Sequence, residues 1–121
     1  MELYNYVISE NQLIESAIEM IEMNSSRCVI IVNSTNKIVG MISEGDILRA
    51  ILKGTSIKSP VANIMNTSFK YLMKIDDEKI LSYFKKGITL IPILSEQGEV
   101  TDVVDMIKYL SEKQVTLTNL I

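Results

Sequence analysis

Residues 28–53, CVIIVNSTNKIVGMISEGDILRAILK, decide the fold of this chain. The run Cys28–Val32 is apolar and rich in β-branched residues, which predicts a strand buried on both faces. Residues 33–36 are polar and predict a turn, and residues 38–42 resume the apolar pattern as a second strand beside the first. Ser43 is then a suitable N-cap for a helix with acidic residues in its first turn. The stretch therefore predicts a strand pair followed by a helix.

The residues before and after this stretch predict further elements. Ser9 followed by Gln12 is a capping-box signal, and apolar residues then recur at helical spacing. Ser59 and Pro60 form a similar start signal later in the chain, and Asp76 is a third N-cap candidate. In chain order we expect a strand at 4–8, a helix at 10–23, a helical turn at 61–66, a strand at 69–73, a helix at 77–86, strands at 90–94 and 100–104, and a last helix from Asp105 or Met106.

The second half of the chain repeats the first. Residues 90–110 follow the order strand, turn, strand and helix at an offset of 62 residues, which aligns Leu90 with Cys28. A length of 121 residues suits one ordinary domain or two small repeats with a shared core. A hydrophobic content of 47% with only 6% aromatic residues favours a core of aliphatic side chains in an α/β fold.

Three residues at the junction of strand and helix form a motif. Gly40, Ser43 and Asp46 are spaced as Gly-x-x-Ser-x-x-Asp, after a strand and a polar turn. In this context, and with the internal repeat, the motif resembles the nucleotide-binding pattern of CBS (cystathionine-β-synthase) domains, which occur as tandem pairs. The resemblance covers residues 8–110.

This resemblance implies a fold and a division of the chain. We expect an α/β fold of tandem CBS repeats, each with the order β-α-β-β-α, related by pseudo-two-fold symmetry and packed sheet against sheet with flanking helices. The first repeat with its connector is expected at residues 1–58 and the second at residues 59–112. Residues 113–121 are expected to be a C-terminal tail or a linker to another domain.

The resemblance also implies a ligand site. In the family the hydroxyl and the carboxylate of the motif contact the phosphate and the ribose of an adenosyl ligand, which here is AMP, ADP, ATP or S-adenosylmethionine. A helix N-terminus does offer free N–H groups to an anion, and a carboxylate accepts hydrogen bonds from ribose hydroxyls. The alternative for the loop and strand residues is a purely structural role, with Cys28 as an inert core thiol. The implied ligand-binding residues are Ser26, Arg27, Cys28, Met41, Ser43 and Asp46.

The second copy of the motif has lost this chemistry. Asp102 and Asp105 stand at the positions of the glycine and the serine, and Lys108 stands at the position of the aspartate. An ammonium group has donors only, so Lys108 cannot accept from ribose hydroxyls. The sequence therefore predicts one ligand per chain.

Composition excludes several other functions. Asp and Glu outnumber Lys and Arg by 15 to 12, the net charge is −3, and histidine is absent. Scattered cations argue against nucleic-acid binding, and a single cysteine without histidine argues against a zinc site. The chain has neither an apolar run of about 20 residues nor the basic-then-apolar start of a signal peptide. We expect a cytoplasmic protein without catalytic residues, metal or cofactor, and without nucleic-acid or membrane partners.

Two functions remain open at this point. The first is a regulatory adenosyl-ligand module that controls an attached or partner enzyme, because residues 47–69 resemble the CBS pairs that precede sugar-phosphate nucleotidyltransferase domains. The second is a structural homodimerisation module with a vestigial ligand site. Both are compatible with a homodimer, which we expect because the helices from Glu44 and Met106 carry surplus apolar residues, namely Ile47, Leu48, Ile51, Ile107 and Leu110.

Overall fold

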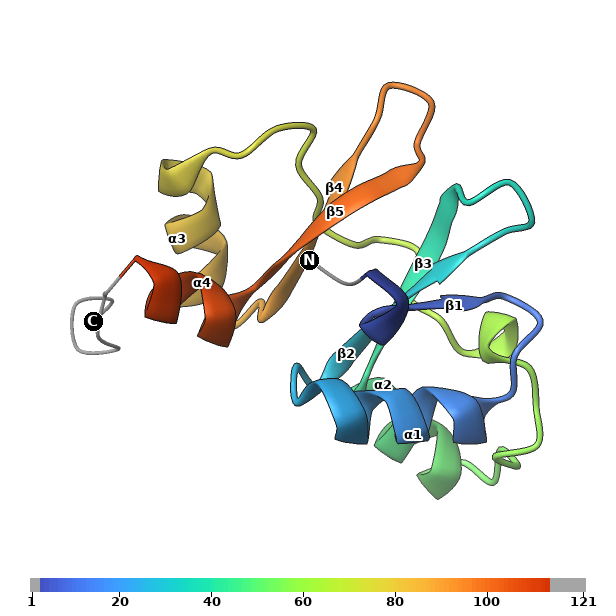
Figure 1. Cartoon of the computed structure of the whole chain (residues 1–121). Coiled ribbons are helices and arrows are strands. Elements are labelled where there is room, and N and C mark those ends of the chain that lie inside the picture. The colour runs from blue at the N-terminus through green and yellow to red at the C-terminus, as the bar shows by residue number, and fades with distance from the viewer. Residues whose placement is uncertain (1–2, 114–121) are drawn as a thin grey trace.

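The computed structural model describes residues 3–113 and contains two similar halves (Figure 1). The first half holds a 3-10 turn Leu3–Asn5, β1 (Val7–Ser9), α1 (Ile14–Asn24), β2 (Cys28–Val32), β3 (Ile38–Ser43) and α2 (Glu44–Leu52). A connector with a second 3-10 turn, Val61–Asn63, leads to α3 (Asp77–Lys85), β4 (Leu90–Leu94), β5 (Val100–Asp105) and α4 (Met106–Glu112). The C-terminal tail lies outside the described residues, apart from Lys113.

The two halves form separate sheets with matching register. In the first sheet β1 runs parallel to β2, and β2 pairs antiparallel with β3. In the second sheet β4 pairs antiparallel with β5. The register shifts after Ile31 in one pair and after Ile93 in the other, which are positions 62 residues apart. The internal repeat predicted from the sequence is thus confirmed down to the position of the β-bulge.

The sheets lie between the helices and share a core. Val29 and Ile31 of β2 pack toward α1 and α2, whereas Ile30 and Val32 pack toward β4 and β5. Such alternation buries both faces of β2, as its continuous apolar run predicts. The helices of the two halves lie on opposite sides of the paired strands (Figure 1).

Hydrogen bonds join the halves at both ends of the strands. At the hairpin tips, Ile38 N–H donates to the carbonyl of Gly98 (3.0 Å), and Val100 N–H donates to the carbonyl of Asn36 (3.2 Å). At the other end the hydroxyl of Thr89 donates to the carbonyl of Ser26 (2.7 Å). The first two contacts join the hairpin tips, and the third holds the loops that precede β2 and β4 against each other.

The strand expected at residues 69–73 is not formed. Only Leu72 pairs there, in a parallel bridge with Ile93 of β4. In the first half, β1 is anchored by a hydrogen bond from Ile30 N–H to the carbonyl of Tyr6 (2.7 Å). The residue 62 positions later is Pro92, which has no N–H to donate, so the ladder cannot extend in the same way.

The first helix starts later than its capping-box signal indicates. Ser9 Oγ accepts from Asn11 N–H (3.2 Å) in a local turn, and α1 begins at Ile14 without a side-chain cap. The connector supplies the missing acceptors, because Ile14 N–H donates to the carbonyl of Ser59 (2.9 Å) and Glu15 N–H to that of Ile57 (3.0 Å).

Two further boundaries differ from expectation. Residues 3–5 form a 3-10 turn before β1. The turn expected at residues 61–66 is the 3-10 turn Val61–Asn63, with Pro60 as its N-cap.

Candidate functional site

The start of α2 is held by a reciprocal pair of hydrogen bonds. Ser43 Oγ accepts from Asp46 N–H (3.2 Å), and Asp46 Oδ2 accepts from Ser43 N–H (2.9 Å). Asp46 Oδ1 also pairs with the Arg49 guanidinium at 2.8 Å. The hydroxyl proton of Ser43 and the second lone pair of each Asp46 oxygen stay available for a ligand. The motif therefore caps the helix and still presents a donor and acceptors at its N-terminus.

Gly40 of the motif has a packing role. A Cβ at this position would lie 2.7 Å from both Cγ and Sδ of Met65, in the connector. Met65 packs on the core beneath α1 and α2, and Asn66 pairs with Met41 through two main-chain hydrogen bonds of 3.0 and 2.8 Å. Glycine at this point lets the connector lie directly against β3.

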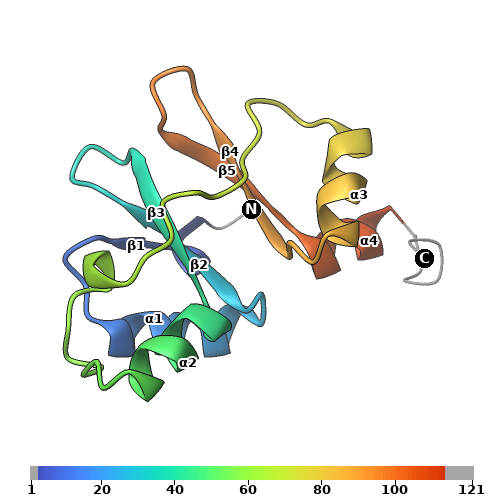
Figure 2. The same cartoon turned by 180° about the vertical axis from the view of Figure 1, so that it is seen from behind.

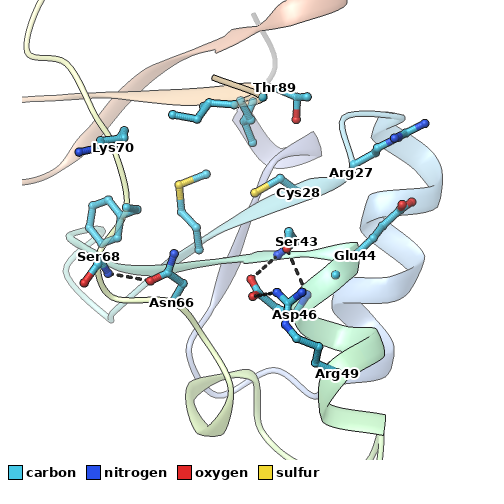
Figure 3. A pocket seen from close by; sticks show the side chains of 16 residues that line it. Arg27, Cys28, Ser43, Glu44, Asp46, Arg49, Asn66, Ser68, Lys70 and Thr89 are labelled. Carbon is cyan, nitrogen blue, oxygen red and sulfur yellow. Dashed lines mark hydrogen bonds and ion pairs between the residues drawn. The ribbon is translucent and has the colours of Figure 1, made fainter. Parts of the chain in front are cut away.

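A cavity of about 660 Å³ opens beside this helix start, between the two halves of the chain (Figure 3). The first half contributes Arg27, Cys28, Met41, Ser43, Glu44, Gly45, Asp46 and Arg49. The connector contributes Asn66, Ser68, Phe69 and Lys70, and the loop before β4 contributes Gly87, Ile88, Thr89 and Leu90. Both halves are therefore needed to form the cavity.

Five of the six residues expected to bind the ligand line this cavity: Arg27, Cys28, Met41, Ser43 and Asp46. Ser26 does not. The backbone is left-handed at Ser25 (φ 56°) and at Arg27 (φ 63°), and Ser26 between them lines a smaller cavity of about 300 Å³ that also includes Asp105. Ser26 is 3% exposed, and its Oγ has no hydrogen-bond partner among the described residues.

Cys28 lies in the cavity wall and also packs against the core. Burial, and to a smaller extent the negative charge of Asp46, raise the pKa of its thiol to about 12. The thiol is therefore protonated at neutral pH and unreactive as a nucleophile. It contributes a small apolar surface beside Met41.

Sequence reasoning missed the half of the cavity that comes from the connector and the second repeat. Asn66 is a notable member, because its Oδ1 accepts from Ser68 N–H (2.9 Å) while no partner for its Nδ2 is found within residues 3–113. The loop at residues 87–90 lies 62 positions after residues 25–28. Its place in the repeat was thus a usable signal: each loop before a central strand extends across to the other repeat.

The corresponding position in the second repeat is occupied by the protein itself. Asp105 is 4% exposed and caps α4, accepting from Ile107 N–H (3.0 Å) through Oδ1. Its Oδ2 accepts from the Tyr6 hydroxyl (2.7 Å), and the ammonium of Lys108 lies 5.5 Å from the centroid of the Tyr6 ring. Burial and the bond to Asp105 raise the pKa of Tyr6. A ligand in this position would have to displace the Tyr6 side chain from the core.

Within residues 3–113 no cluster of three or more His, Cys, Asp or Glu side chains is arranged to hold a metal ion. None of the helices in this part of the chain has the length and apolar character that a membrane span requires.

Comparison with known proteins agrees with this architecture. Residues 4–53 match the family model of the CBS domain. The chain contains a CBS domain. Two proteins from different Helicobacter pylori strains, both described as uncharacterized, are 35% and 34% identical to it over 92 residues. The match covers 72% of this chain but only 28% of each relative, so the chain spans a little over a quarter of the length of the relatives it matches.

Solved structures, among them CBS-domain proteins, share the fold over nearly the whole chain. The CBS domain protein PAE2072 from Pyrobaculum aerophilum, complexed with AMP, is 19% identical, covers 95% of this chain and 89% of its own, and has a TM-score of 0.75. CBS domains of a transcriptional regulator from Streptococcus pneumoniae are 13% identical. The match covers 90% of this chain and 88% of that one, with a TM-score of 0.72. The cytosolic domain of the Mg²⁺ channel MgtE, in complex with ATP, is 18% identical. The match covers 89% of this chain and 45% of that one, with a TM-score of 0.68. The likeness includes the second half, so both halves adopt the tandem CBS fold.

Proposed function

We propose that the chain is a regulatory module that binds one adenosine-containing ligand in the cavity between its halves and does not itself catalyse a reaction. The observation that carries the proposal is the cavity of about 660 Å³ at the capped start of α2, because it falls within the size range of small-molecule sites, about 300–1,000 Å³. Support comes from PAE2072 and MgtE, which have this fold and were solved with AMP and ATP.

The lining of the cavity suits a ligand with one apolar and one polar end. Cys28, Met41 and Phe69 offer apolar surface for a flat ring. Ser43 and Asp46 offer a hydroxyl and a carboxylate that suit a phosphate oxygen and ribose hydroxyls. The side chain of Arg49 is 65% exposed, so it can swing from Asp46 toward an anionic group of the ligand. We propose AMP, ADP, ATP or S-adenosylmethionine as the ligand class, with Arg27 at the rim.

The controlled enzyme is proposed to be a sugar-phosphate nucleotidyltransferase in the cytoplasm, attached to the chain or bound by it. The support is the resemblance of residues 47–69 to CBS pairs that precede such enzymes. The greater length of the two relatives leaves room in those proteins for a further domain.

A homodimer is proposed from the outer faces of two helices. Leu48, Ile51 and Leu52 on α2 are 59%, 45% and 78% exposed, and Ile107 on α4 is 58% exposed. Ile47 and Leu110, also expected at this surface, are buried within the chain at 6% and 4% exposure. The exposed set supports self-association with or without a ligand. It is also the observation that favours the alternative of a purely structural dimerisation module.

A thermal-shift screen with AMP, ADP, ATP and S-adenosylmethionine tests the proposal. A ligand present at about 100 times its Kd is expected to stabilise the chain by about 2.7 kcal/mol. A stabilisation by at least one of the four compounds supports the sensor. No shift with any of them at millimolar concentration would leave the structural dimerisation module as the better account.

A further inference from the structure

We propose that residues 71–75 form the edge of a docking site for an extended, acidic peptide segment of a partner protein. These residues belong to the connector that runs from beside β4 to the start of α3 (Figure 2). Residues 71–74 border a groove of about 500 Å³, whose other wall includes Lys79 and Tyr83 of α3. The backbone, the side chains and the charges of this groove point to the same kind of occupant.

One backbone edge of the segment is open. Leu72 donates its N–H to the carbonyl of Pro92 (3.0 Å), and its own carbonyl accepts from Leu94 N–H (2.8 Å). Both polar groups of Leu72 therefore point toward β4. Within residues 3–113, no main-chain hydrogen bond of Tyr71 or Met73 is found. An extended peptide gains main-chain hydrogen bonds by pairing with such an edge.

The side chains along this edge are apolar and exposed at every second position. Tyr71, Met73 and Ile75 are 47%, 54% and 55% exposed, whereas Leu72 between them is 7% exposed. The backbone bends at Met73 and Lys74, so these three exposed side chains follow a bend and not a straight strand. A run of apolar groups on the surface is typical of an interaction site. A peptide beside this edge would cover the run with its own apolar residues.

The charge of the groove selects an acidic partner. Lys70, Lys74 and Lys79 line it together with a single carboxylate, Asp76. This positive groove lies on a chain whose net charge is −3, so it differs in sign from the molecule as a whole. Complementary charge gives specificity and speeds association. Carboxylates between the apolar residues of the peptide would meet these ammonium groups.

The groove touches the proposed ligand cavity. Phe69 and Lys70 line both. On the assumption that the cavity binds a nucleotide, as proposed above, a peptide in the groove and a nucleotide in the cavity share two side chains. Each ligand must then change the affinity of the other by the same factor. The groove thereby offers the regulatory module an output surface.

The test uses phage-displayed random short peptides and the wild-type chain without nucleotide. Selection is expected to enrich peptides in which Asp or Glu alternates with apolar residues. An enriched peptide is then synthesised, and fluorescence anisotropy measures its affinity for Lys74→Glu/Lys79→Glu and for the control Lys37→Glu/Lys53→Glu. The two variants change the net charge by the same amount. The control substitutions lie in the first repeat, outside the groove. We expect a loss of about tenfold or more, corresponding to about 1.4 kcal/mol, for the groove variant only.

Several results would overturn the docking site: no enriched peptides, enrichment of basic or uncharged ones, or equal loss in both variants. Self-association of the chain that Lys74→Glu/Lys79→Glu abolishes would identify a second copy as the occupant instead. Because these measurements are made without nucleotide, their failure is distinct from failure of the proposed function. In a chain that does bind AMP, a peptide affinity unaltered by saturating AMP would refute the coupling.

Discussion

The hydroxyl of Tyr6 lies 2.7 Å from Oδ2 of Asp105, the residue that stands in the second repeat where Ser43 stands in the first. The second repeat has a position that corresponds to the candidate ligand site of the first. The side chain of Tyr6, through this contact, closes that position. Lys108, over the face of the Tyr6 ring, completes the arrangement. The two repeats therefore have the same fold, but only the first presents an open motif.

We predict that each chain binds one molecule of AMP. The second position offers an ammonium group where an acceptor for ribose hydroxyls is required, and Tyr6 fills the space beside it. Isothermal titration calorimetry measures the stoichiometry directly. Two equivalent sites per chain would contradict the assignment of Tyr6 as a permanent occupant.

Replacement of Tyr6 by phenylalanine is predicted to change stability and its pH dependence. At neutral pH, Tyr6→Phe leaves a buried carboxylate oxygen of Asp105 without its donor, which should cost about 1–3 kcal/mol. In the wild type the folded-state pKa of Tyr6 is raised by burial and by Asp105, so this group's contribution is complete below pH 10 and is lost as pH rises above it. Denaturant unfolding between neutral pH and pH 11 should show a shallower alkaline decline in the variant.

Tyr71→Phe is the matched control for this experiment. Tyr71 is 47% exposed, and its hydroxyl makes no hydrogen bond with the described residues. Its replacement should leave both the stability at neutral pH and the alkaline decline unchanged. A Tyr6→Phe curve that coincides with the Tyr71→Phe curve would contradict the structural role of the contact.

Asp46→Ala is predicted to weaken AMP binding by roughly 2–4 kcal/mol. The estimate follows from about 1.5–3 kcal/mol for each hydrogen bond to a charged group, reduced for solvent access. Since Asp46 also completes the capping box of α2, the variant should lose about 0.5–2 kcal/mol of stability. Asp76→Ala removes a comparable cap from α3, away from the cavity, and controls for that effect. An AMP affinity within threefold of wild type in Asp46→Ala would remove Asp46 from the site.

Gly40→Ala is predicted to destabilise the chain by about 1–3 kcal/mol, because the added Cβ would overlap Met65. The same change in a Met65→Ala background should be much less harmful, since the overlapping atoms are gone. Denaturant unfolding of the two single variants and the double variant measures the coupling between the positions. Additive effects would show that the glycine is not required by this contact.

The sequence predicted most of the fold because its signals were local. The apolar runs of β2 and β4 and the N-caps Ser43 and Asp76 each depend on adjacent residues, and the structure confirms them. The offset of 62 residues then allowed the elements predicted for the first half to be assigned to the second half. The prediction failed at residues 69–73, where the pairing partner is β4 and Pro92 lacks the donor that β2 has at the same place.

The site was harder to predict because it is built across the repeats. Arg27, Ser43 and Asp46 follow from the motif and its neighbours, but Phe69 and Thr89 enter the cavity only through the packing of one half on the other. The direction of Ser26 depends on left-handed backbone at both adjacent residues, which neither serine nor arginine signals in a sequence. Composition also could not reveal that Tyr6 reaches Asp105, 99 residues away.

Leu52→Glu is predicted to weaken the proposed homodimer at least tenfold. Leu52 on α2 is 78% exposed, and a buried carboxylate without a partner opposes association. Met23→Glu on α1, where the native side chain is 76% exposed, is the control and should leave the dimer unchanged. Sedimentation analysis of the variants gives the dissociation constants. An equal response of the two would place the interface elsewhere.

Saturating AMP is predicted to change the dissociation constant of that dimer. Asp46 and Arg49 face the cavity from α2, and Leu48 and Leu52 lie on the outer surface of the same helix, so a ligand that alters the Asp46–Arg49 pair acts on the element that carries the interface. The shift can be no larger than the difference in AMP affinity between monomer and dimer, typically about 1–3 kcal/mol. Sedimentation with and without AMP measures it, and hydrogen exchange in α2 reports the local change. If both are unaltered in a chain that binds AMP, this surface carries no signal, and the output must lie at another surface such as the groove beside residues 71–75.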